Sequence, residues 1–426
     1  MNRSIRVWGA FVVVHALLAW ICLGMPGTGI GDYALGLPLG DVTLVYRPWI
    51  EQALSGYGVP GISEPWVYPI AALVPMLVAM VGGPDTYGVV WLILVSGLNA
   101  LALALVLGRG NSPRRRAAAW WWIAFTAALG PIAVARIDAI TVPLAVVALL
   151  LVAKHPRIAG ILLAVTTWIK VWPAAIIGAL LVASRRRWTV LAIGIVTSAV
   201  IAAAVIGAGG GAYLFSFVTE QTGRGLQIEA PVATPYLWLA ALGNESSFIY
   251  YSREILTFQV AGPNVDTVAL FMTPLLALAV AAIVAAGARA VRRGARMVRL
   301  LPPLILALVV TLQLFNKVGS PQFLTWLIAP IVLGIVWRGR GYAVPAGIAL
   351  ALAALTQVVY PYLYWRLLAA DPLLIAVLTV RNIGYLVLLG WAVHAVLTAD
   401  RRSDVAPVSS FDSVTMAPQP FPSAQE

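Results

Sequence analysis

Long apolar runs alternate with short basic clusters along most of this chain. Several of the runs reach the ~20 residues that a helix needs to cross a bilayer. They predict twelve membrane-spanning helices, at about 7–25, 86–107, 117–133, 137–153, 158–170, 172–184, 188–207, 266–288, 300–315, 323–336, 342–358 and 373–397. We therefore expect an all-α, polytopic membrane protein.

The apolar run 69–81 breaks this alternation. Counted as a full crossing, it would carry the next basic cluster, at 114–116, to the opposite side of the membrane. At about 13 residues it is also shorter than a crossing requires. We therefore predict a short re-entrant or interfacial helix here.

The basic clusters give the topology. Lysine and arginine gather at 114–116, 154–157, 185–187, 289–299 and 338–340, and the positive-inside rule places such clusters in the cytoplasm. Both termini are then cytoplasmic, in a multi-pass protein of the plasma membrane. On this topology 20 of the 28 Lys and Arg residues are cytoplasmic, whereas 12 of the 16 acidic residues lie outside or near the outer face. The polar chemistry is therefore expected on the extracytoplasmic side.

Composition excludes several classes of function. Hydrophobic residues make up 61% of the chain and the net charge is +12. Topology and contact with anionic inner-leaflet lipids explain this charge, so nucleic acid is not an expected partner. The single cysteine excludes an intramolecular disulfide, and no His, Cys or acidic residues stand at metal-ligand spacing, so we predict no metal or other cofactor. The chain also lacks the glycine-rich motifs that bind nucleotides.

One membrane domain is predicted to cover residues 1–400. Residues 401–426 are rich in Ser, Pro and Ala and lack helical periodicity, so a disordered cytoplasmic tail is expected. Four stretches are predicted to lie outside the membrane, at 26–68, 208–265, 316–322 and 359–372. The two long stretches are the expected catalytic loops.

Asp41 lies in the first of these loops, at the start of a predicted helix. Positions 45, 49, 50 and 53 fall on one face of that helix and are apolar, which predicts an amphipathic helix along the membrane surface. A carboxylate at this place could remove a proton from a hydroxyl nucleophile. It could equally cap the helix.

Lys170 occurs in T-T-W-I-K-V-W-P, between two apolar halves of about 13 residues. Each half reaches only ~20 Å, less than the ~30 Å hydrocarbon core, so Lys170 is expected within or near the outer part of the membrane. A lysine there costs roughly 2.5–3.5 kcal/mol to insert unless an anion or a water-filled cavity compensates its charge. A phosphate would suit the ammonium group. An ion pair with Asp138, or snorkelling to the interface, would do so without a ligand.

Other polar residues mark the predicted outer loops. Arg136 and Asp138 sit at an outer turn, where they could pair with each other, pair with Lys170 or contact a substrate. Arg224 stands between two glycines, in a flexible backbone that could approach an anionic or sugar ligand, and Glu229 follows nearby.

The stretch F-N-K-V-G-S-P-Q-F-L-T-W lies where a predicted helix ends outside. Its Lys317 could bind a phosphate or a lipid headgroup, with Gln322 close by in the sequence. Ser320, followed by proline, could simply open the next helix.

In their order along residues 30–390, several motifs resemble those of the GT-C membrane glycosyltransferases, specifically the polyprenol-phosphate-mannose-dependent mannosyltransferases of glycosyltransferase family 87. The motifs are D-V-T-L-V-Y-R-P-W, E-P-W-V-Y-P, R-I-D-A-I-T-V-P-L-A, G-I-L-L-A-V-T-T-W-I-K-V-W-P, G-R-G-L-Q-I-E-A-P, N-K-V-G-S-P-Q-F-L-T-W and a late R-N-I.

The resemblance implies a GT-C fold and an inverting transfer of mannose from polyprenyl-phosphate-mannose to a hydroxyl of a glycolipid or lipoglycan of the cell envelope. It implies Asp41 as the base and Lys170 as the group that faces the lipid-linked phosphate. It also implies that Arg224, Lys317 and Gln322 line the same cavity. Further candidate substrate-binding residues are Tyr46, Tyr68, Arg136, Asp138 and Glu229.

Other functions remain compatible with the residues alone. A transporter or flippase of polyprenyl-linked sugars would share the intramembrane cations and broken helices, although the sequence shows no related halves. A scaffold without catalysis would tolerate the loss of Asp41 and Lys170. A related enzyme could use another sugar such as arabinose, and the residues do not choose between a 1,2 and a 1,6 linkage or fix the oligomeric state.

Overall fold

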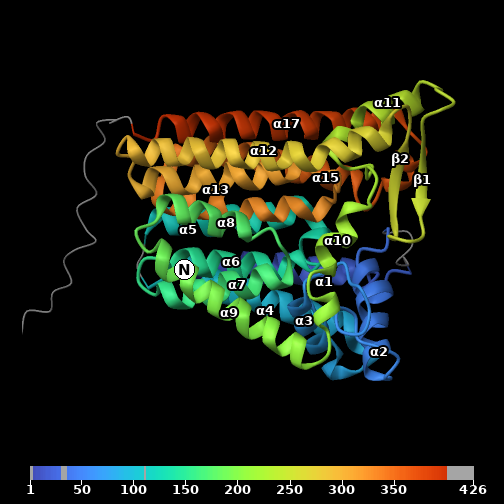
Figure 1. Cartoon of the computed structure of the whole chain (residues 1–426), viewed down its shortest axis with the longest axis horizontal. Helices are drawn as coiled ribbons and strands as arrows, with labels where there is room; N and C mark the ends of the chain where they lie inside the picture. The colour runs from blue at the N-terminus through green and yellow to red at the C-terminus, as the bar shows by residue number, and fades with distance from the viewer. Residues whose placement is uncertain (1–2, 30–35, 110–111, 401–426) are drawn as a thin grey trace, which may run out of the picture.

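Long helices run side by side from one end of the molecule to the other (Figure 1). The structure is a computed structural model and describes residues 3–29, 36–109 and 112–400. The longer helices are α1 (Arg3–Cys22), α4 (Tyr87–Leu107), α5 (Pro113–Leu129), α9 (Arg187–Gly207), α12 (Val265–Arg292), α13 (Met297–Leu314), α15 (Ala343–Val359) and α17 (Pro372–Leu397). Shorter helices between them are α6 (Asp138–Leu151), α7 (Pro156–Ile169), α8 (Ala174–Ala183) and α14 (Ile328–Arg338).

Short elements gather at the end of the molecule drawn on the right in Figure 1. They include α2 (Arg47–Leu54), α3 (Leu73–Ala79), α10 (Ser216–Thr222), α11 (Thr234–Ala241), α16 (Tyr364–Leu368) and the short helical segments η1 (Val42–Tyr46), η5 (Gly130–Ala133) and η8 (Pro321–Leu327). The strands β1 (Phe248–Ser252) and β2 (Thr257–Ala261) form an antiparallel hairpin beside them.

Proline and aspartate define several helix starts. Pro113, Pro156 and Pro372 occupy the first turn of α5, α7 and α17, where the missing N–H removes no helical hydrogen bond. Asp371 also caps α17, since its side chain accepts hydrogen bonds from two backbone N–H groups of the first turn. Each of these residues therefore marks where a helix begins.

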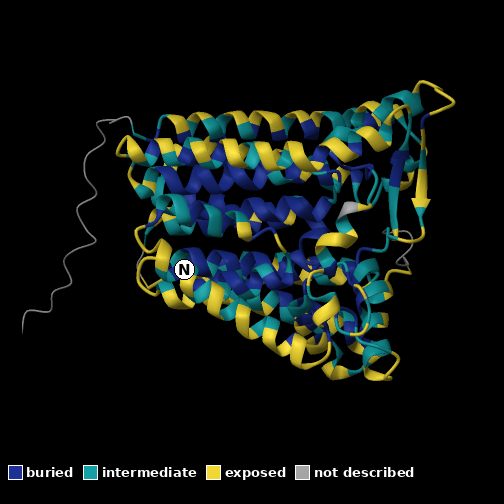
Figure 2. Ribbon diagram, viewed as in Figure 1, coloured by how far each residue is buried: buried dark blue, intermediate teal, exposed yellow. Residues whose placement is uncertain are grey.

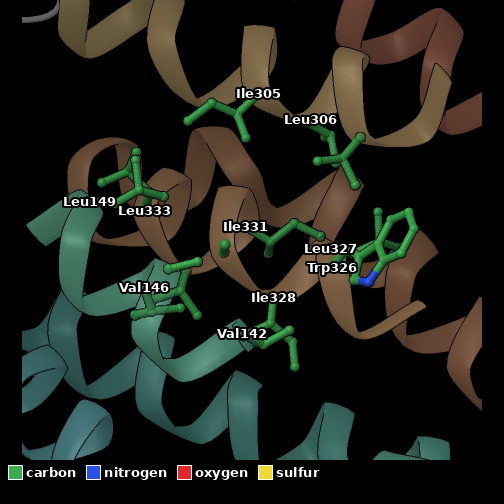
Figure 3. Packing of buried hydrophobic residues seen from close by; sticks show 14 of the residues in the cluster. Val142, Val146, Leu149, Ile305, Leu306, Trp326, Leu327, Ile328, Ile331 and Leu333 are labelled. Atoms are coloured by element: carbon green, nitrogen blue, oxygen red, sulfur yellow. The ribbon is translucent and has the colours of Figure 1, made fainter. Parts of the chain in front are cut away.

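The core lies around α13 and α14. Residues 300–311 of α13 and 328–335 of α14 are buried on all sides, and α14 packs against α5, α6 and α13. Figure 3 shows Val142 and Val146 of α6 facing Ile328 and Ile331 of α14. Helices that are apolar all round are expected in such a central position.

The outer helices expose apolar side chains. Of the apolar 18-residue stretch of α13, 78% is buried, whereas only 11% of the corresponding stretch is buried in α9 and in α12. Exposed residues follow the outward sides of α9, α12 and α17 (Figure 2), and they include Val200, Phe271 and Val387. Because water would penalise so much exposed apolar surface, these faces fit a lipid environment.

The structure agrees with an all-α membrane protein. Each of the twelve segments predicted to cross the membrane contains a helix. Within the described ranges, seven helical segments are long and apolar enough to span a bilayer, and α6, α7 and α8 are shorter apolar helices. The count of twelve crossings therefore stays a prediction. The run 69–81 does form short helical segments, over Ile70–Gly82, and the predicted tail 401–426 lies outside the described residues.

The hairpin was not expected in an all-α chain. Its strands alternate side chains between two faces, and the adjoining segment 226–228 extends its pairing: Val260 N donates to Leu226 O, and Ile228 N donates to Phe258 O. On its other side this segment meets the loop after α13, where Gln227 N donates to Lys317 O at 3.0 Å. The hairpin therefore positions two of the loops that carry candidate residues.

Candidate active site

A cavity of about 870 Å³ opens among the loops at the end of the bundle where the hairpin lies. It brings together residues from the start of η1, the turns that follow η5 and α7, the segment 224–229, the β1–β2 hairpin and the loop 316–322. Of the candidate site residues, the following line it: Asp41, Tyr46, Tyr68, Arg136, Lys170, Arg224, Glu229, Lys317 and Gln322. Segments far apart in the sequence thus converge on one chamber.

Asp41 forms an ion pair with Arg136, whose Nε lies 3.0 Å from the carboxylate Oδ2. The Asp41 side chain is 39% exposed, whereas that of Arg136 is 6% exposed. Asp41 makes no capping hydrogen bond, so the alternative of a helix cap is wrong. A carboxylate has about four acceptor positions, which leaves Asp41 free to accept a further hydrogen bond from the cavity.

Arg136 is held by more than Asp41. One of its terminal nitrogens donates to the carbonyls of Pro38 and Ala135, both at 2.7 Å, and the other donates to the Tyr360 hydroxyl at 2.6 Å. Because most of its donors are occupied by protein groups, Arg136 can fix the orientation of Asp41.

Lys170 stands at the C-terminal end of α7 with its side chain 18% exposed. Its Nζ lies 3.7 Å from Oδ2 of Asp138, which is completely buried. The other carboxylate oxygen of Asp138 accepts a hydrogen bond from the Trp326 indole at 2.6 Å. Asp138 thus lies behind the cavity wall and supports Lys170 from there.

Two aromatic rings also face the ammonium group of Lys170. Its Nζ lies 4.9 Å from the centroid of the Tyr68 ring and 5.4 Å from that of Phe323, distances at which a ring face attracts a cation. Phe323 stacks on Trp326, with centroids 4.3 Å apart. The cation is therefore held in one position at the cavity wall.

Two further cations come from the loops. Lys317 is largely buried, and Arg224 donates from Nε to the Glu220 carbonyl at 3.3 Å. Burial, reinforced by Arg224, lowers the pKa of Lys317 below its ordinary value, and burial likewise lowers the pKa of Arg224. An anion bound between them would offset this repulsion and desolvation.

Glu229 is engaged in a buried ion pair with Arg381 of α17. The two side chains are 2% and 3% exposed, and Nη1 of Arg381 lies 3.0 Å from Oε2 of Glu229. Arg381 also donates to the Glu229 carbonyl at 2.8 Å. Burial raises the pKa of Glu229, and Arg381 offsets only part of that effect. The pair ties the segment 224–229 to the helix bundle.

An aromatic wall borders Asp41. Tyr46 is almost completely buried, with its hydroxyl 3.5 Å from that of Tyr68 and their rings in edge contact at 6.1 Å. Trp49 stacks on Tyr46 at 6.1 Å. Tyr46 therefore shapes the wall, while the face of Tyr68 is turned toward Lys170.

The other part of the cavity is apolar. It extends between α8, α12 and α13, where Gly178, Leu276, Val280 and Leu312 are among its lining residues. Along α12 the lining reaches from Thr273 to Val284, about 16 Å at the helical rise. We call this part the apolar arm. It begins beside Lys170 and continues into the bundle.

Sequence reasoning found most of the polar residues but missed several partners. Trp326 and Phe323 lie within one of the family-like motifs, yet nothing marked them as supports for Asp138 and Lys170. Tyr360 belongs to a predicted outer stretch and binds Arg136. No group of three or more His, Cys, Asp or Glu residues gathers among the described residues, and the absence of a metal cofactor stays a prediction.

The fold and cavity define a polytopic membrane protein with a carboxylate, several cations and an apolar arm in one chamber. The sequence model of glycosyltransferase family 87 matches residues 66–300. The chain belongs to this family and is a membrane glycosyltransferase. A search of curated proteins finds no match. Asp41, Lys317 and Gln322 lie outside the matched residues, so the geometry alone places them beside Lys170 and Arg224.

Proposed function

We propose that the protein transfers mannose from polyprenyl-phosphate-mannose to a hydroxyl group of a glycolipid or lipoglycan acceptor, with inversion at the sugar carbon. The reaction takes place on the extracytoplasmic side of the plasma membrane, and both termini are cytoplasmic. The observation that carries this proposal is the continuity of the polar chamber with the apolar arm. A donor with a phosphate next to a long hydrocarbon chain fits such a cavity.

Asp41 is the proposed base. The acceptor hydroxyl gives its proton to Asp41 while its oxygen bonds to the anomeric carbon of mannose. The bond from that carbon to the phosphate oxygen breaks in the same displacement, and polyprenyl phosphate leaves. Arg136 keeps the carboxylate turned to the cavity through the 3.0 Å contact.

The carboxylates that line the cavity support the proposal of an inverting transfer. Those that line the cavity in the described residues are Asp41, Glu229 and Glu254. Glu229 is tied to Arg381, and Glu254 lies in the hairpin turn. A single displacement with one base is the simplest mechanism that this arrangement supports.

The cations stabilise the leaving group. Charge develops on the phosphate oxygens as the bond breaks, and positive groups already in place lower the energy of that state. Lys170 is held by Asp138 and by the rings of Tyr68 and Phe323. Lys317 and Arg224 lie on the same cavity. These three cations would stabilise the leaving phosphate without a divalent metal.

The apolar arm offers a direct test of the lipid-linked donor. A Cβ at Gly178 would meet no atom within 4 Å, so Gly178→Leu should fold normally and fill the arm. Transfer of radiolabelled mannose from a long-chain polyprenyl-phosphate-mannose should fall about ten-fold or more, whereas transfer from a short-chain analogue should persist. Gly194→Leu on α9, also with open space at the Cβ, is the matched control.

The same assay tests the donor class. Wild type is expected to use polyprenyl-phosphate-mannose and not a nucleotide-linked mannose. Transfer from the nucleotide donor alone would overturn the proposal, and transfer of arabinose but not mannose from a polyprenyl donor would correct its sugar.

A further inference from the structure

The β1–β2 hairpin contributes one of its two faces to the cavity. In its register Tyr251 pairs with Phe258, so their side chains share a face, and their rings lie 4.9 Å apart. Both residues line the same cavity as Asp41. Phe248 and Tyr250 are on the opposite face, since side chains alternate along a strand.

Contacts from outside the hairpin hold this face in place. Phe258 O accepts a hydrogen bond from Ile228 N, and the Phe258 ring meets Tyr364 of α16 edge to face at 6.1 Å. Tyr251, by contrast, is 47% exposed. A fixed ring therefore supports a second, half-exposed ring that also lines the chamber.

The hairpin turn adds polar and apolar groups to the same rim. Glu254, Leu256 and Thr257 also line the cavity. A carboxylate accepts hydrogen bonds from neighbouring hydroxyl groups. Flat rings beside such a carboxylate suit a sugar, because the C–H bonds of one sugar face meet the negative face of an aromatic ring while its edge carries hydroxyls.

We propose that Tyr251, Phe258 and Glu254 form the subsite that binds the sugar ring of the acceptor. This inference rests on the proposed function, in which an acceptor hydroxyl must reach Asp41. In the proposed function the hydrocarbon chain of the donor occupies the apolar arm, which continues into the helix bundle. The hairpin, by contrast, lies at the end of the bundle (Figure 1). An acceptor that enters from outside the bundle would meet the hairpin first.

Binding of methyl α-D-mannopyranoside tests the subsite without requiring turnover. Saturation-transfer NMR on the full chain in nanodiscs should show contacts to the sugar C–H groups. Tyr251→Ala should raise the dissociation constant about five-fold or more, while Tyr251→Phe, which keeps the ring, should stay within about two-fold. Phe248→Ala removes a 53% exposed aromatic ring from the opposite face and should change nothing.

Polyprenyl phosphate binding, measured on the same samples, separates this inference from the proposed function. Loss of mannoside binding in Tyr251→Ala with unchanged polyprenyl phosphate binding supports the subsite. Absence of mannoside binding by wild type, equal binding by wild type and Tyr251→Ala, or a joint loss of both ligands would overturn it. If wild type binds mannoside through Tyr251 but binds no polyprenyl phosphate, the subsite stands and the donor assignment fails.

Discussion

Breaking the ion pair between Asp138 and Lys170 should lower the stability of the protein, whatever its substrates are. At 3.7 Å, two unit charges interact by about 4.5 kcal/mol at an effective dielectric constant near 20. Asp138→Asn keeps an oxygen that can accept from Trp326 but removes the negative charge. Lys170 is then left without its counter-charge, and the free energy of unfolding should fall by about 3–5 kcal/mol, as when one partner of a buried pair is removed.

Equilibrium unfolding of the purified protein in mixed detergent micelles measures this change. Adding Lys170→Met to Asp138→Asn should restore most of the stability, because no buried charge remains. Polyprenyl phosphate should stabilise Asp138→Asn more than wild type, since the ligand replaces the missing anion. Glu51→Gln is the control: Glu51 pairs with Arg47 at a similar 3.6 Å but is 42% exposed, so its loss should cost only about 0.3–0.5 kcal/mol.

The reasoning is refuted if Asp138→Asn and Glu51→Gln destabilise the protein equally. It is also refuted if the double variant is no more stable than Asp138→Asn, because the cost would then come from something other than the unpaired ammonium group.

Two further predictions concern the loops. Burial and the nearby Arg224 lower the pKa of Lys317, so its ammonium group loses its proton at a lower pH than an ordinary lysine does. Polyprenyl phosphate affinity should therefore weaken with rising pH before ordinary lysines begin to lose their protons. Lys317→Arg should flatten this dependence, and an unchanged profile would exclude Lys317 from the phosphate site. A Cβ at Gly319 would collide with the backbone nitrogen of Ala230, so Gly319→Ala should destabilise the protein by about 1–3 kcal/mol and reduce transfer. Gly194→Ala, where a Cβ would meet open space, should do neither. Equal unfolding and transfer for the two variants would contradict the close approach.

The helices could be predicted from the sequence because their signal is local. Apolar length, flanking basic clusters and prolines at the first turn mark α5, α7 and α17 without reference to the rest of the fold. The strands of the hairpin also have a local signal, because polar and apolar residues alternate in T-F-Q-V-A and aromatic residues, which favour strands, are frequent in F-I-Y-Y-S. The dominant helical pattern of the chain concealed it.

The pairings of the charged residues could not be predicted in the same way. Asp41 had a sufficient local explanation as a helix cap, and only the fold shows that Arg136 binds its carboxylate. The ion pair between Lys170 and Asp138 was one of several ways in which the charge of Lys170 could be compensated. Glu229 and Arg381 are far apart in the sequence, and no periodicity relates them. Such contacts depend on how distant helices pack, which composition and spacing do not encode.

The role of Asp41 is the central claim, and a comparison of wild type with Asp41→Asn tests it most directly. Mannosyl transfer from polyprenyl-phosphate-mannose and binding of that donor should be measured on the same purified samples, with Glu51→Gln as the control acid outside the cavity. We expect Asp41→Asn to bind the donor within about two-fold of wild type and to lose about 100-fold or more of the transfer rate, as when a general base is removed. Equal transfer by wild type and Asp41→Asn would contradict the account.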